Sequence, residues 1–117
     1  MNNFIDIEDI DSNQLKKILA FSAGLKAERK NISKGTKDFK KYLTNKVVAL
    51  LFKKPSTRTR FSFEVGIFQM GGQTLTVSSN EMQISNFESM TDTARVLSRY
   101  LDMVVLRTDN HSDLIDL

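Results

Sequence analysis

Five consecutive side chains that can all donate hydrogen bonds stand between an apolar run and a segment with helical spacing. They are Ser56-Thr57-Arg58-Thr59-Arg60. Hydroxyl and guanidinium groups at the start of a helix suit a small, doubly charged oxyanion, because free backbone N–H groups and the helix dipole also favour an anion there. The same residue types also occur at an ordinary capped helix with two solvated arginines, so the residues by themselves leave both interpretations open.

The segments on either side of these residues have the pattern of a strand and a helix. Residues 47–52 form a continuous apolar run, typical of a strand that is buried on both faces of a parallel sheet. A helix is expected from about Thr57 to Met70, with Gly71-Gly72 ending it. Its apolar stripe consists of Phe61, Val65 and Phe68, with Ile67 and Met70 beside it.

The other elements complete an alternating order. A helix behind the N-cap candidates Asp11-Ser12 is expected to run to about Arg29. The later elements are a short helical turn at about 39–43, strands at 74–78 and 103–106, a helix opened by Ser89 and Asp92, and the start of a helix at 112–117. That third helix is expected to turn Ala94, Leu97 and Leu101 inward and Arg95 and Arg99 outward. The order predicts the α/β class, with a parallel sheet flanked by helices.

Two further polar residues follow strands of this predicted sheet. Ligands of open α/β sheets collect beyond the carboxyl ends of the strands, where the 56–60 segment also lies. Arg107 follows the third strand, and Gln83 lies in the polar loop after the second. Taken singly, each is more common as a surface residue than as a ligand. His111 stands without a second histidine or any cysteine, which argues against a metal site.

Composition and charge narrow the function classes. The chain has 117 residues, enough for at most one compact domain, and a formal net charge of +3. Residues 26–54 hold ten basic side chains and two acidic ones, which a nucleic-acid surface would explain; without interleaved aromatic residues, a solvated lysine-rich surface explains them better. No apolar run approaches the length of a membrane span. The absence of cysteine fits a reducing, cytoplasmic setting and excludes a cysteine nucleophile.

The segment from Phe52 to Glu64 closely resembles the signature of the aspartate/ornithine carbamoyltransferase family. Residues 65–72, Glu88-Ser89 followed by 92–100, and 106–111 resemble the ornithine branch. The resemblance covers nearly the whole chain and agrees with the α/β order. It departs from the family pattern at Ser85-Asn86-Phe87, where members usually have a Gly-containing, often basic stretch.

The resemblance implies roles for individual residues. The residues that match those holding the phosphate of carbamoyl phosphate are Ser56, Thr57, Arg58 and Thr59. Arg58 would also stabilise charge during transfer, and Arg107 would contact carbamoyl phosphate as the second catalytic residue. Arg60 matches an arginine with a largely structural role. Gln83 matches a carbamoyl-phosphate residue that reaches the site of a neighbouring subunit in a homotrimer.

The resemblance also implies a reaction: carbamoyl transfer from carbamoyl phosphate to the δ-amine of ornithine, giving citrulline and phosphate, in arginine metabolism and without cofactor or metal. Because family members are much longer, residues 1–117 are expected to be a truncated carbamoyl-phosphate-binding domain. The ornithine-binding domain would be absent and the chain alone inactive. The alternatives are an aspartate carbamoyltransferase, a non-catalytic phosphate-binding or anion-binding fragment, and a nucleic-acid-binding protein.

Overall fold

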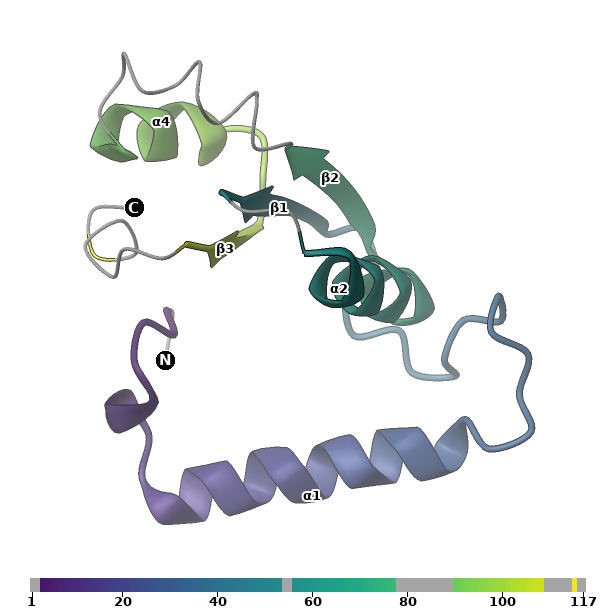
Figure 1. Ribbon diagram of the computed structural model, residues 1–117. Helices are drawn as coiled ribbons and strands as arrows, with labels where there is room; N and C mark the ends of the chain where they lie inside the picture. Colours follow the sequence, from purple (N-terminus) through teal and green to yellow (C-terminus); the bar gives the residue numbers. More distant parts are fainter. Residues whose placement is uncertain (1–2, 54–55, 78–89, 109–114, 116–117) are drawn as a thin grey trace. The chain divides into compact units, whose positions relative to one another are not determined.

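The computed structural model describes residues 3–53, 56–77, 90–108 and 115. The structure divides into two compact units, Met1–Thr36 and Lys37–Leu117, and each unit is described by itself. Figure 1 shows the elements of both. Within the described part of the chain, no helix is both long and apolar enough to cross a membrane.

The first unit consists of a short 3-10 helix, η1 (Ile7–Asp9), and the helix α1 (Ser12–Glu28). Helix α1 starts where the sequence predicts, because Asp11 caps it. The Asp11 carboxylate accepts the Gln14 N–H at 2.7 Å, and the Gln14 side chain accepts the Asp11 N–H at 2.9 Å. This reciprocal capping box satisfies two backbone donors that the helix itself leaves unpaired. The predicted end near Arg29 is confirmed to within a residue.

The second unit is built on a three-stranded parallel sheet, which confirms the predicted fold class (Figure 1). Its strands are β1 (Val47–Phe52), β2 (Gln73–Val77) and β3 (Met103–Arg107), in the order β2-β1-β3. The helix α2 (Thr57–Gln69) connects β1 to β2, and α4 (Met90–Leu97) lies between β2 and β3 in the chain. Each predicted strand is present to within one residue.

Strand β1 is buried on both faces, as its unbroken apolar run predicts. Every residue from Val48 to Phe52 is at most 5% exposed. Val48, Leu50 and Phe52 pack with Ile67 of α2 on one face. On the other face, Ala49 and Leu51 meet Leu97 and Leu101 from α4 and the turn after it. The core of this unit is therefore β1 enclosed by an element on each side.

The apolar stripe expected on α2 does not face this core. Phe61, Val65 and Phe68 are 50%, 47% and 43% exposed, whereas Ile67 is 5% exposed. The sheet covers α2 at the buried Ile67, which packs with Val48, Leu50 and Phe52. Apolar spacing fixes the existence of a helix, but the position of the sheet decides which row it covers.

Two boundaries differ from the sequence-based expectation. Helix α4 ends at Leu97, and residues 98–100 form a turn, so Leu101 reaches the core from outside the helix. Arg95 and Arg99 are exposed, as predicted. Residues 42–45 form a turn in place of a helical segment near 39–43. The expected cap at Ser89, the inward side of Ala94 and the helix at 112–117 lie outside what the structure describes.

Asp102 fixes the starts of two strands to each other. Its carboxylate oxygen Oδ2 accepts the Val47 N–H at 2.8 Å, and its own N–H donates to the Val47 carbonyl at 2.9 Å. The pair closes the β1–β3 ladder at its amino end, one residue before the register pair Val48 and Met103. The opposite end of the same ladder is thereby held in register at Phe52 and Arg107.

Gly71 and Gly72 end α2 in a Schellman motif. The Gly71 N–H donates to Phe68 and the Gly72 N–H to Ile67, each at 2.9 Å. Gly71 has φ +87°, and a Cβ there would lie 2.9 Å from Cβ of Lys41. This glycine is therefore required both by the left-handed backbone and by the close approach of the 37–46 segment.

We expect Gly71→Ala to lower the free energy of unfolding by about 1–3 kcal/mol, because it adds a left-handed alanine and a steric contact. The measurement is urea unfolding of the 117-residue chain, followed by circular dichroism. Gly66→Ala, inside α2, is the matched control, because nothing lies within 4 Å of the added Cβ. It should raise stability by about 0.5–1 kcal/mol. Equal effects of the two substitutions would contradict this account of Gly71.

Candidate functional site

The candidate site lies where β1 and β3 end side by side. Phe52, the last residue of β1, is in register with Arg107, the last residue of β3. The Lys53 N–H extends this pairing by donating to the Arg107 carbonyl at 3.0 Å. Helix α2 begins four residues later, at Thr57. The predicted anion segment and Arg107 therefore stand at one edge of the sheet, the edge at which open α/β folds bind ligands.

A side-chain hydrogen bond joins these two parts of the site. Nη1 of Arg107 donates to Oγ1 of Thr59 at 2.6 Å, across 48 positions of sequence. The sequence places both residues after strands, the family resemblance implies a site role for each, and the structure brings them into contact. Because the guanidinium can only donate, the Thr59 hydroxyl must accept here, and its own proton stays available for a second acceptor.

The first turn of α2 offers backbone donors. Ser56 occupies the N-cap position with φ −149° and ψ 86°, and its side chain makes no capping hydrogen bond. The Arg60 N–H donates to the Ser56 carbonyl at 2.9 Å, which is the first bond inside the helix. The N–H groups of Thr57, Arg58 and Thr59 precede that bond and so have no partner within the helix. An ordinary side-chain cap, the alternative interpretation of Ser56, is not formed.

The charge of this turn is the reverse of what stabilises a helix. Arg58 and Arg60 stand in the first turn of α2, which holds no acidic residue. Cations at a helix N-terminus oppose the helix dipole, whereas an anion there is favoured. Arg58 is exposed. A dianion bound here would offset the unfavourable charge and accept hydrogen bonds from the backbone N–H groups.

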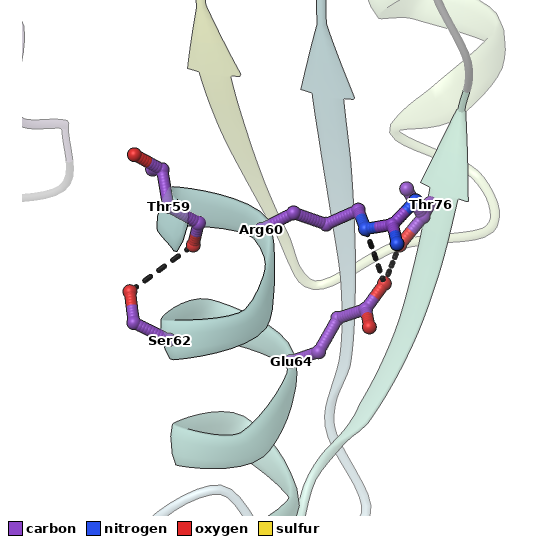
Figure 2. A network of polar contacts seen from close by, with 5 residues as sticks. All are labelled: Thr59, Arg60, Ser62, Glu64 and Thr76. Carbon is purple, nitrogen blue, oxygen red and sulfur yellow. Dashed lines mark hydrogen bonds and ion pairs between the residues drawn. The ribbon is translucent and has the colours of Figure 1, made fainter. Parts of the chain in front are cut away.

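Arg60 has different neighbours from the rest of the segment. Its Nε lies 4.0 Å from Oε1 of Glu64, and its guanidinium carbon lies 5.1 Å from the centroid of the Phe61 ring. The same Glu64 oxygen accepts a hydrogen bond from the Thr76 hydroxyl of β2 at 2.6 Å. Figure 2 shows this network, together with the Ser62 hydroxyl that donates to the Thr59 carbonyl at 3.1 Å. Arg60 is thus held toward β2, whereas Thr59 is held toward β3.

The remaining predicted residues are placed only in part. Thr57 is exposed at the start of α2, while Gln83 and His111 lie outside the described residues. No group of three or more His, Cys, Asp or Glu side chains that could hold a metal occurs within residues 3–53, 56–77, 90–108 and 115. Sequence reasoning missed Glu64 and Thr76 as members of the site. The four-residue spacing of Arg60 and Glu64 was the available signal for the first.

The family model described as "Aspartate/ornithine carbamoyltransferase, carbamoyl-P binding domain" matches residues 2–117. Curated relatives named ornithine carbamoyltransferase are 46% identical in Cereibacter sphaeroides and 45% identical in Paracoccus denitrificans, each over all 117 residues. The chain spans 38% of the length of either relative.

Solved structures show the same fold. The anabolic ornithine carbamoyltransferase of Campylobacter jejuni matches with a TM-score of 0.84 and 34% identity, over 99% of this chain and 35% of that one. The ornithine carbamoyltransferase of Pyrococcus furiosus matches with a TM-score of 0.86 and 34% identity, over 97% of this chain and 35% of that one. Both similarities extend across β1, α2 and β3, which carry the described part of the site.

We expect Thr59→Val to weaken the binding of inorganic phosphate by roughly tenfold, because it removes one hydroxyl donor and the acceptor of Arg107 without changing side-chain volume. The measurement is isothermal titration of the 117-residue chain with phosphate. Thr74→Val on β2 is the matched control and should leave the affinity unchanged. If Thr59→Val leaves the phosphate affinity unaltered, Thr59 is not part of the phosphate site.

Proposed function

Because the chain belongs to the aspartate/ornithine carbamoyltransferase family, we propose that it supplies the carbamoyl-phosphate site of an ornithine carbamoyltransferase. The reaction is transfer of the carbamoyl group to the δ-amine of ornithine, giving citrulline and phosphate. The observation that carries the proposal is the hydrogen bond between Arg107 and Thr59, since it joins the ends of two strands into one cationic, donor-rich site.

Ornithine is favoured over aspartate as the acceptor. The curated relatives with 45–46% identity over the whole chain are named ornithine carbamoyltransferase, as are the solved structures from Campylobacter jejuni and Pyrococcus furiosus. The motif of residues 52–64 occurs in both branches, so the preference comes from the rest of the chain. Residues that would bind ornithine are not among those placed at this site, and we assign them to the part of the relatives' length that this chain does not span.

The mechanism follows from the donors of the site. The phosphate of carbamoyl phosphate would accept hydrogen bonds from the first-turn N–H groups and from the Ser56, Thr57 and Thr59 hydroxyls. Arg58 would form charge-assisted bonds to the phosphate, and Arg107 to the carbamoyl oxygen, on which negative charge develops as the amine attacks. As the carbamoyl carbon gains its bond to the neutral δ-nitrogen, the bond to the phosphate oxygen breaks, and the leaving phosphate takes up the proton that the nitrogen loses. Fixed donors stabilise this charge without rearranging, because strand ends and a helix hold them.

The family resemblance supports three further proposals. Gln83 would reach the carbamoyl phosphate of a neighbouring subunit in a homotrimer. The enzyme would act in arginine metabolism and be located in the cytoplasm, a setting with which the absence of cysteine agrees. No cofactor or metal is part of the proposed reaction.

Arg58→Ala should weaken carbamoyl phosphate binding by the 117-residue chain by roughly ten- to a hundredfold, because it removes a charge-assisted contact to the dianion. Titration calorimetry measures this. Arg95→Ala on α4 removes the same charge from an exposed helical position and is the matched control. Equal affinities in the two variants would contradict the assignment of Arg58.

The same chain should bind carbamoyl phosphate and yet form no citrulline when ornithine is added. In an ornithine carbamoyltransferase that contains this segment, Arg58→Ala should lower turnover by orders of magnitude. If a longer protein that contains this segment binds carbamoyl phosphate but forms no citrulline, the non-catalytic anion-binding alternative is favoured. Carbamoylation of aspartate in preference to ornithine would place the protein in the aspartate carbamoyltransferase branch.

A further inference from the structure

We propose that Glu64 is a positioning residue that holds Arg60 against β2 and thereby keeps it out of the anion site, so that bound carbamoyl phosphate meets only two guanidinium groups, those of Arg58 and Arg107. The inference rests on the proposed function, because it concerns the same anion. It assigns a role in ligand specificity and release to an acidic residue one turn beyond the donor segment.

Neighbouring residues of α2 are directed toward the two strands that flank β1. Thr59 accepts a hydrogen bond from Arg107 of β3. Arg60, the next residue, pairs with Glu64, which accepts a hydrogen bond from Thr76 of β2. Since β1 lies between β2 and β3, these partners draw the two side chains apart. Figure 2 shows Arg60 extending from the helix toward Glu64 and Thr76, with Thr59 on the other side.

One carboxylate oxygen of Glu64 makes both contacts. Oε1 of Glu64 lies 2.6 Å from the Thr76 hydroxyl and 4.0 Å from Nε of Arg60. The hydrogen bond from the strand fixes this oxygen, and the fixed oxygen then holds the longer arginine. The guanidinium carbon also lies 5.1 Å from the centroid of the Phe61 ring, which adds a cation–π contact.

Stability of the fold does not explain this arrangement. The two side chains of the ion pair are 44% and 33% exposed, and pairs exposed to this extent contribute little to stability. An arginine four residues before a glutamate is the less favourable order on a helix, and an arginine in the first turn opposes the dipole. A role in keeping Arg60 away from the anion that Arg58 binds explains the Arg60–Glu64 pair, whereas a role in stability does not.

The chemistry of the site gives a reason for excluding Arg60. A third guanidinium near the anion would bind substrate phosphate and product phosphate alike. Such uniform binding tightens the ground state and slows release without favouring the transition state. Arg60 stands in the same first turn of α2 as Arg58, and its long side chain can reach the N-terminal end of the helix once Glu64 no longer holds it.

The test is the affinity of the 117-residue chain for inorganic phosphate, measured by titration calorimetry. Glu64→Gln keeps the shape of the side chain and its ability to accept from Thr76, but removes the charge that holds Arg60. We expect phosphate to bind roughly three- to tenfold more tightly, since a freed guanidinium adds a charge-assisted contact. A merely structural role predicts the opposite, because a disturbed helix weakens binding.

Two controls separate the release of Arg60 from a general change in charge. Asp92→Asn makes the same change in net charge at the Arg95–Asp92 pair of α4, and should leave the affinity unchanged. In an Arg60→Gln background, Glu64→Gln should no longer tighten binding. The proposal is overturned if Glu64→Gln leaves affinity unchanged or weakens it, or if the gain persists without Arg60.

A second variant covers the case in which Glu64→Gln does not fold. Thr76→Val keeps every charge and releases the Glu64 oxygen from the strand, so it should tighten phosphate binding in the same direction but less; no change or a loss would overturn the proposal. A separate result would contradict the proposed function: an affinity for carbamoyl phosphate that is the same with and without Arg58. If the unmutated chain binds no phosphate, the proposed function fails and this inference fails with it.

Discussion

The burial of β1 on both faces is the constraint on which the rest of the second unit depends. A strand without a solvent-facing side must pair its backbone groups with neighbours along both edges, because unpaired buried N–H and C=O groups are strongly unfavourable. The order β2-β1-β3 meets this requirement. It also requires an apolar cover on each face, which Ile67 supplies on one and Leu97 and Leu101 supply on the other. The ends of β1 and β3 are adjacent as a direct consequence.

This adjacency determines the geometry of the candidate site. Few residues separate the end of β1 from α2, so the helix N-terminus cannot lie far from the sheet edge. The register that opposes Phe52 to Arg107 then places a guanidinium beside the first helical turn, and the bond to Thr59 completes the connection. Regular elements of the fold carry the backbone donors and Arg107, and donors placed in advance are what electrostatic stabilisation of a transition state requires.

The sequence predicts the elements better than their contacts. The apolar run of β1, the aspartate that caps α1 and the glycine pair after α2 each have a local physical cause, and each is confirmed. The core-facing row of α2 has no such local cause. Phe61, Val65 and Phe68 form the stronger apolar pattern, but the sheet covers Ile67. The contacts of Arg107 with Thr59 and of Glu64 with Thr76 depend on strand order, which no spacing within one segment specifies.

The first turn of α2 breaks rules that the same chain follows elsewhere. Asp6 and Asp11 form complete capping boxes at η1 and α1, whereas Ser56 makes no side-chain cap and is followed by two arginines without an acid in the turn. Local rules are typically broken where function requires it. A bound dianion supplies both missing parts in one group, since its oxygens accept from the first-turn N–H groups that have no partner within the helix, and its charge complements the dipole and Arg58. The disfavoured turn is therefore best understood as one half of a structure that the ligand completes.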